Sequence, residues 1–262
     1  MKIKSNAAFQ EGLNPIVTES VHKGAEMDFS VLKLSGGSTK EFKLPGEAIY
    51  LLINGKVEFS WRNERRTGDR PSCFRNDPVA LQVCHDEAVT IRGLADSSEI
   101  AVITAPSSID FEPVFYTPEM CESVQRGEGT LRETATRIVR NIVNLDRANY
   151  SKFFMGEVIN FPGKWSSYPP HQHDQPEMYY YKFLPEDGYG FSEDGDNAFK
   201  VENNDAGLYL NRSKHSQSAA PGYAMYYIWV IHHTEGNAHK GPDTAEQYMW
   251  TMVPDAVIFP EE

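Results

Sequence analysis

The sequence predicts an all-β protein that contains two copies of one β-barrel unit. The 262-residue chain holds 13 Tyr, 14 Phe and 4 Trp, and these residue types favour strands. Short apolar or alternating runs follow one another between turn residues without helical periodicity, which is typical of a β-sandwich or barrel. A faint internal repeat relates the two halves of the chain, and two copies of one unit explain it most simply.

The first barrel is expected within residues 1–115. Ser35-Gly36-Gly37-Ser38 predicts a turn of the chain. Asn54-Gly55, between an apolar run and an alternating run, is the strongest hairpin signal in the sequence. The expected strands are 29–34, 47–53, 56–61, 80–83, 89–91 and 99–104.

Residues 116–150 change in character, because charged residues mix there with β-branched ones. We interpret them as a connection between two domains that enters an extended strand. The strand pattern then resumes, and residues 151–262 are expected to form the second barrel.

The internal repeat is carried by similar spacings in the two halves. Glu47 heads an apolar run in the first half, and Glu177 heads a Tyr-rich run in the second. At a similar distance from each Glu, an Asn-Asp pair precedes a further strand, at Asn76-Asp77 and at Asn204-Asp205. The first half has no His-x-His sequence and only His85 near the corresponding place, so we expect it to be a metal-free structural copy.

Composition and charge argue against some classes of partner. The net charge of −12 argues against a general nucleic-acid or membrane-surface binder, because phosphate contacts need clustered Lys and Arg. With 40% hydrophobic and 24% charged residues, the chain has the composition of an ordinary globular protein. Because the net charge is negative, an anionic substrate would need a local basic pocket to overcome the overall field.

The expected location is the cytoplasm. No apolar run follows residues 1–6, so no signal peptide is expected, and no segment has the apolar length that spans a membrane. Cys73, Cys84 and Cys121 are odd in number and lack the spacing of metal ligands, so we expect reduced, partly buried thiols.

The chain is organised around two histidines and a glutamate in its second half. His171 and His173 lie two residues apart, so in a strand both side chains lie on one face. Residues 174–176 predict a tight turn, and Glu177 begins a second strand that can run back beside the first. Two imidazoles and a carboxylate would then meet at one point, as suits a catalytic divalent metal.

His215 is the expected fourth ligand, because it lies one strand pair after the first three. An exposed loop histidine is the alternative interpretation. His232, His233 and His239 compete for the same place, and we rank them lower because they lie in a polar, Gly-containing loop.

The motif His171-x-His173-x-x-x-Glu177 resembles the metal motif of the cupin superfamily. The flanking segments 156–159 and 162–174 are similar to those of the 5-deoxyglucuronate isomerases of inositol catabolism. That family consists of two-cupin proteins of about this length and is grouped with the uronate ketol-isomerases of pectin breakdown. The resemblance implies two tandem cupin barrels, also described as double-stranded β-helices or jelly-roll-like barrels, with the metal in the second.

The resemblance covers most of the chain. Segments 68–74 and 101–106 resemble the family's first domain, and segments 126–127 and 137–141 resemble its inter-domain stretch. The implied activity is a metal-dependent aldose–ketose isomerisation of 5-deoxy-D-glucuronate to 5-dehydro-2-deoxy-D-gluconate. The implied metal ligands are His171, His173, Glu177 and His215. Zn or Mn is the expected metal, with Fe or Ni as alternatives.

Two departures from the family keep other functions open. The short turn at 174–176 is closer to the uronate ketol-isomerase branch, and the segment before His215 lacks the usual proline-glycine turn. The alternatives are a uronate ketol-isomerase, another cupin enzyme such as an iron dioxygenase, and a non-catalytic sugar-binding protein.

Tyr179 and Tyr181 alternate with Glu177, so all three side chains are expected to point into the barrel. Glu177 is assigned as a catalytic metal ligand and Tyr179 as a catalytic acid or base, while Tyr181 contacts substrate or fills the core. A sugar acid also needs a cation for its carboxylate. Arg212 is the first choice because it lies near the fourth metal ligand, and Lys164 is another candidate. Exposed sheet edges favour a homo-oligomer.

Overall fold

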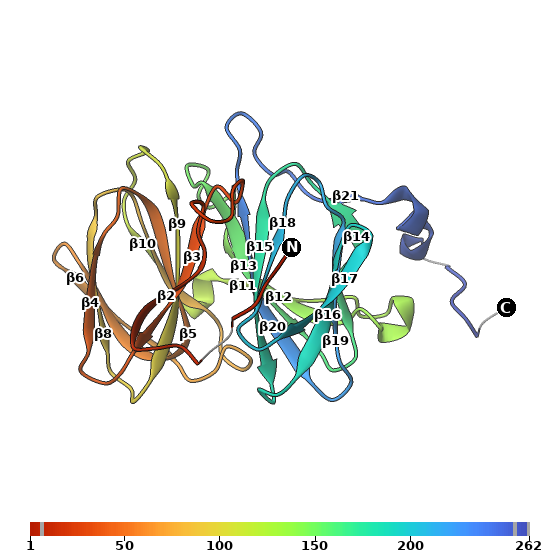
Figure 1. The fold of residues 1–262 in the computed structure, drawn as a ribbon, viewed down its shortest axis with the longest axis horizontal. Coiled ribbons are helices and arrows are strands. Elements are labelled where there is room, and N and C mark those ends of the chain that lie inside the picture. The colour runs from red at the N-terminus through yellow and green to blue at the C-terminus, as the bar shows by residue number, and fades with distance from the viewer. Residues whose placement is uncertain (6–7, 254–255, 261–262) are drawn as a thin grey trace. The chain divides into compact units, whose positions relative to one another are not determined.

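The protein folds into two compact units, each built around a barrel of strands (Figure 1). A computed structural model describes residues 1–5, 8–253 and 256–260. The N-terminal unit comprises Asn6–Glu122 and Ile142–Phe154, and the C-terminal unit comprises Met1–Ser5, Ser123–Asn141 and Met155–Glu262. The segment expected to connect two domains, 116–150, therefore contributes residues to both units.

The N-terminal unit consists of antiparallel strands in two layers. One sheet has the order β10-β7-β5-β9-β3-β2, while β6 and β8 pair with the second half of β5, and β4 pairs with β8. The strands are β2 Gly12–Val17, β3 Asp28–Leu34, β4 Thr39–Lys43, β5 Gly46–Trp61, β6 Glu64–Arg70, β7 Val79–Val83, β8 Ala88–Gly93, β9 Ser98–Pro106 and β10 Val114–Tyr116. The strands expected near residues 29, 80, 89 and 99 are confirmed as β3, β7, β8 and β9.

The hairpin predicted at Asn54-Gly55 is wrong, because β5 continues through these residues without a turn. The pairing of β5 with β9 is irregular between Leu52 and Asn54, and Gly55 has a φ of +99°. The side chains of β5 that belong to the core are Ala48, Tyr50, Leu52, Val57, Phe59 and Trp61. Their numbers change from even to odd at the irregularity. The irregularity therefore lets one strand cross from one sheet to the other while it contributes side chains to the same core cluster on both sides of the crossing.

The interior of the N-terminal barrel is filled with apolar side chains. Leu32, Leu81 and Ile100 are fully buried there and belong to one cluster with the inward residues of β5. Among the described residues of this unit, no group of His, Cys, Asp and Glu is arranged to hold a metal ion. The interior of this barrel is therefore a packed apolar core.

The C-terminal unit also consists of two antiparallel sheets. One has the order β1-β18-β15-β20-β13-β12-β11, and the other has the order β17-β16-β19-β14-β21. Its strands are β1 Lys2–Ile3, β11 Glu122–Arg126, β12 Arg137–Val143, β13 Phe153–Asn160, β14 Trp165–Gln172, β15 Glu177–Leu184, β16 Tyr189–Asp194, β17 Asn197–Glu202, β18 Ala206–Tyr209, β19 His215–Ala219, β20 Ala224–His232 and β21 Asp243–Thr244. Strand β12 confirms the extended strand expected at the end of the connection.

Helical structure is confined to three short 3-10 segments in the described part of the chain, η1 Pro118–Met120, η2 Leu131–Glu133 and η3 Glu246–Met252. None of them has the length and apolar character needed to cross a lipid bilayer.

The strand that contains His171 and the strand that begins at Glu177 do not pair with each other. β14 and β15 belong to different sheets of the C-terminal unit, so the expectation that the second strand runs back beside the first is wrong. The residues between them cross from one sheet to the other. The neighbour of β14 is β19, whose His215 pairs directly with His171.

Candidate metal centre

Three buried side chains converge inside the C-terminal barrel. Nε2 of His173 lies 2.8 Å from Oε2 of Glu177, and Nε2 of His215 lies 2.9 Å from the same oxygen. One potential ligand atom from each residue lies within 4.8 Å of the other two. His173 follows β14 directly, Glu177 begins β15 and His215 begins β19, so both sheets contribute to the cluster.

His171 lies at the edge of this cluster. Its ring centroid is 4.6 Å from that of His215 and 6.4 Å from that of His173. It is only partly buried, and burial together with His215 lowers its pKa to about 4. The structure thus places all four predicted ligands together, with His173, Glu177 and His215 as the tightest group.

The orientation of each imidazole is set by a backbone carbonyl. Nδ1 of His173 lies 2.9 Å from the carbonyl oxygen of Gln175, and Nδ1 of His215 lies 3.0 Å from that of Ser213. A carbonyl can only accept, so each Nδ1 donates a proton. In the neutral ring, the lone pair of Nε2 then faces Glu177. Metal-binding histidines typically have this arrangement.

The lone pairs and the carboxylate would repel one another unless a cation lay among them. Burial disfavours the ionised form of Glu177, but His215 and His173 outweigh burial and hold its pKa below the usual value. Burial likewise disfavours a charged His215, yet Glu177 raises the His215 pKa. Imidazole nitrogens and a carboxylate are ligands that divalent metal ions prefer, so this donor set fits such an ion.

Tyrosines line the barrel next to the cluster. The ring of Tyr179 is 5.7 Å from that of His215 and stacks at 4.7 Å on that of Tyr227. The hydroxyl group of Tyr181 lies 2.8 Å from that of Tyr209 and donates to Gln217 at 2.8 Å. Burial raises the pKa of Tyr179 and Tyr181 well above the ordinary value, so both are neutral hydrogen-bonding groups.

Ser167 joins two of these tyrosines. Its hydroxyl group lies 3.1 Å from that of Tyr179 and 3.3 Å from that of Tyr227. Ser167 has a φ of +49°, and the pairing of β14 with β19 is irregular between Ser166 and His171. Left-handed backbone at a residue other than glycine is unfavourable and is often found at functional sites.

The two predicted cationic substrate ligands have other partners. Arg212 forms ion pairs with Asp174 at 2.5 Å and with Asp243 at 2.6 Å, and its side chain is exposed. Nζ of Lys164 donates to the carbonyl oxygen of Glu133 at 2.5 Å. The guanidinium charge of Arg212 is thus balanced by two carboxylates at the surface.

Sequence reasoning missed several side chains of the site. Tyr227 and Tyr209 lie on β20 and β18, which carry no recognisable motif, although β20 is rich in aromatic residues. Ser167 lies on β14, the strand of His171, but its own position gave no signal. His239, ranked low as a fourth ligand, lies with its ring 4.8 Å from that of His173 but outside the tightest group.

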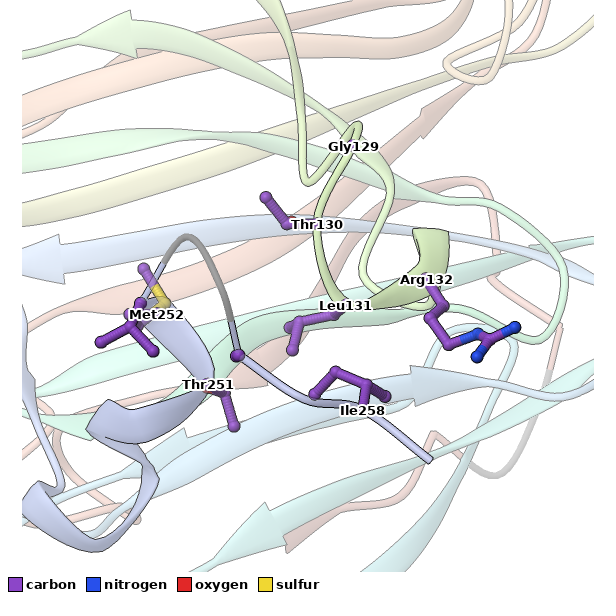
Figure 2. Close-up of a pocket in the computed structure, with 9 residues that line it drawn as sticks. Gly129, Thr130, Leu131, Arg132, Thr251, Met252 and Ile258 are labelled. Atoms are coloured by element: carbon purple, nitrogen blue, oxygen red, sulfur yellow. The ribbon is translucent and has the colours of Figure 1, made fainter. Parts of the chain in front are cut away.

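A separate pocket lies between η2 and the C-terminal segment (Figure 2). It has a volume of about 570 Å³ and is lined by Gly129, Thr130, Leu131, Arg132, Thr251, Met252, Val253, Ala256 and Ile258. It shares no residue with the histidine–glutamate cluster. The cluster, and not this pocket, holds the groups suited to metal chemistry.

Comparisons with known proteins agree with the geometry. The KduI/IolB family model matches residues 2–251. A 5-deoxy-glucuronate isomerase from Geobacillus kaustophilus is 31% identical over an alignment of 251 residues, and the match covers 87% of this chain and 87% of that protein. An IolB-like protein from Salmonella typhimurium LT2 has a similar structure, with a TM-score of 0.83 and 22% identity over 95% of this chain and 98% of that chain.

The barrels have the cupin fold. A cupin 2 conserved barrel domain protein from Leptotrichia buccalis aligns with a TM-score of 0.53 and 14% identity, over 86% of this chain and 92% of that chain. Three observations lead to one conclusion: the chain forms two tandem barrels, the second holds a histidine–glutamate cluster, and the family model matches nearly the whole length. The chain belongs to the KduI/IolB family.

Proposed function

We propose that the protein is a metal-dependent aldose–ketose isomerase that converts 5-deoxy-D-glucuronate into 5-dehydro-2-deoxy-D-gluconate in inositol catabolism. The observation that carries the proposal is the convergence of His173 and His215 on Glu177, with both Nε2 atoms facing the carboxylate. Family membership and the name of the Geobacillus kaustophilus relative support the reaction and the substrate.

The reaction moves a hydrogen between a carbonyl carbon and its neighbour. A divalent metal bound at the cluster would polarise the carbonyl oxygen as a Lewis acid. The protein's own residues hold the sugar and shield it from water. Tyr179 is a neutral phenol at pH 7, so it can donate a hydrogen bond to a substrate oxygen on which negative charge develops.

We propose Zn or Mn as the metal, because imidazole and carboxylate ligands suit both, with Fe or Ni as alternatives. His171, His173, Glu177 and His215 would hold it.

A cytoplasmic location and a homo-oligomer remain part of the proposal. The location is supported by Cys73, Cys84 and Cys121, which are buried and are not part of a disulfide, as is usual for proteins in reducing compartments. The homo-oligomer still rests on the general tendency of proteins to cover exposed sheet edges.

The first test is the isomerisation of 5-deoxyglucuronate by metal-loaded protein, followed by NMR, with bound metal measured by elemental analysis. We expect conversion by the natural protein. His173→Ala should lose bound metal and roughly 100-fold or more of the activity, because it removes a ligand of the tightest group. His85→Ala, an N-terminal histidine outside the cluster, is the control.

Three outcomes would favour the alternatives. Conversion of a ketol-isomerase substrate of uronate breakdown, but not of 5-deoxyglucuronate, would indicate the related branch of the family. Oxygen consumption by the Fe(II) form would indicate a dioxygenase. Metal and sugar binding without turnover would indicate a sugar-binding protein.

A further inference from the structure

Arg137 lies on β12, two strands away from the tyrosine-bearing strand β20 in the same sheet. On the same strand, Nη1 of Arg140 lies 3.5 Å from Oε2 of Glu157, whose Oε1 accepts a hydrogen bond from Tyr226. These three residues mark one face of the sheet. Because side chains alternate along a strand, Arg137 lies on the opposite face from Arg140, and Tyr227 lies on the opposite face from Tyr226.

That opposite face is the inside of the barrel. Tyr227 pairs across the strands with Tyr181 and stacks on Tyr179, whose ring lies 5.7 Å from that of His215. Arg137 is therefore on the same side of the sheet as the tyrosines and the metal ligands. Ring contacts join Tyr227 to Tyr179 and Tyr179 to His215. These contacts extend from the region of Arg137 to the metal centre.

The guanidinium of Arg137 is partly buried and has few partners. Nη1 donates to the carbonyl oxygen of Ala135 at 2.8 Å. Among the side chains that the structure describes, no Asp or Glu forms an ion pair with it, whereas Arg140 and Arg212 both have carboxylate partners. An arginine has five N–H donors, and burial of such a group is unfavourable unless an anion satisfies it.

Electrostatic interactions agree with this placement. Burial lowers the pKa of Arg137. Tyr227 and Tyr179 raise the pKa of this guanidinium, whereas Arg126 lowers it further. The two tyrosines are thus near enough to influence the guanidinium. In a protein of net charge −12, a cation inside the barrel is also what an anionic substrate requires.

We propose that Arg137 binds the carboxylate of the sugar-acid substrate, at the end of the barrel interior opposite the metal centre. The reacting end of the sugar would lie at the histidine–glutamate cluster, and its hydroxyl groups would lie along Tyr179 and Tyr227. The planar fork of arginine matches a carboxylate with two parallel hydrogen bonds. The inference rests on the proposed function and makes it specific for uronates. It also assigns to Arg137 the role that the sequence favoured for Arg212.

The test compares two substrates, 5-deoxyglucuronate and 5-deoxyglucose, which has a neutral hydroxymethyl group in place of the carboxylate. Arg137→Gln should lower kcat/KM for the acid about 100-fold, mainly through KM, and leave the neutral sugar unaffected, because the fork binds only the carboxylate. Arg137→Lys keeps the charge without the fork, so it should show an intermediate loss and serves if the Gln variant folds poorly.

Arg65→Gln is the control, because it removes an exposed positive charge from β6 of the N-terminal unit. It should change kcat/KM by no more than about twofold, as expected for a screened surface charge. Equal losses for the acid and the neutral sugar in the Arg137 variants would show a merely structural role and overturn the proposal. An unchanged KM for the acid would overturn it as well.

A binding measurement separates this inference from the proposed function. If the natural protein fails to isomerise 5-deoxyglucuronate, the proposed function is wrong. The role of Arg137 is then measured by calorimetric titration of metal-loaded protein with D-glucuronate. We expect Arg137→Gln to bind it about 100-fold more weakly than the natural protein. Equal affinity, or no binding by the natural protein, would contradict the role of Arg137.

Discussion

At the scale of single residues, the orientation of the metal ligands is fixed by very local bonds. Each histidine of the cluster directs Nδ1 at a backbone carbonyl two residues away, Pro169 for His171, Gln175 for His173 and Ser213 for His215. Such bonds select the tautomer whose Nε2 is free to bind a metal. The orientation of each ligand is therefore set by a bond within its own short segment, and not by the pairing of distant strands.

The role of Tyr179 can be tested against its neighbour on the strand. Tyr179→Phe removes a hydroxyl group beside the cluster, and we expect kcat to fall about 100-fold, as for other single donors to a developing oxyanion. Tyr180→Phe is the control, because Tyr180 lies on the opposite face of β15 and donates to Asn204. Kinetic assays with metal analysis should show full metal content in both variants. A Tyr179→Phe enzyme with normal kcat would exclude its role as a donor.

At the scale of elements, the long strand β5 shows how one irregularity organises a barrel. A Cβ atom on Gly55 would lie 2.4 Å from Oγ of Ser98 and 2.6 Å from its Cα. Gly55 thus combines a left-handed backbone with close contact to β9. Only glycine meets both requirements at low energy.

Two glycines of similar φ can separate backbone strain from steric contact. Gly12 has a φ of +94°, and a Cβ atom there would meet nothing within 4 Å. We expect Gly12→Ala to lower the unfolding free energy by about 1 to 2 kcal/mol through backbone strain alone. Gly55→Ala should lower it by roughly a further 1 to 3 kcal/mol, because Ser98 must move. Urea unfolding measures both, and equal losses would show that the contact is unimportant.

At the scale of the whole molecule, the chain passes repeatedly between the two units. Residues 123–141 belong to the C-terminal unit, and the next residues, 142–154, return to the N-terminal unit. There Ser151 donates to Oε1 of Glu47 at 2.6 Å, and the backbone N–H of Lys152 donates to Oε2 at 2.7 Å. Glu47, on β5, therefore holds the segment 142–154 against that strand through these hydrogen bonds.

The pH dependence of stability should report on this buried carboxyl group. Burial raises the pKa of Glu47 above its usual 4.5, even though Lys152, Ser151 and Gln82 donate to it. Its stabilising contribution is therefore complete below pH 4.5 and is lost as the pH rises through the higher pKa of the folded state. The unfolding free energy of Glu47→Gln, relative to the natural protein, should rise over the same range.

Urea unfolding at several pH values between 4.5 and 8 measures this difference. Glu41→Gln, on the exposed side of β4, is the matched control. A difference between Glu47→Gln and the natural protein that stays constant with pH would contradict the raised pKa.

The β-rich fold class, the family and the His171–Glu177 motif could all be predicted from the order of the amino acids. These conclusions depend on short-range patterns: alternation along a strand, the spacing of ligands and the composition of the chain. His215 could be chosen because the repeat placed it one strand pair downstream.

The pairing of distant strands, by contrast, became known from the folded structure. Alternation shows which side chains share a face, but it does not show which distant strand that face meets. Thus β14 and β15 lie in different sheets, β5 continues through Asn54-Gly55, and Arg137 lies on the face of Tyr227. Each of these features depends on contacts between residues far apart in the chain, where packing and long-range strand pairing override local turn signals.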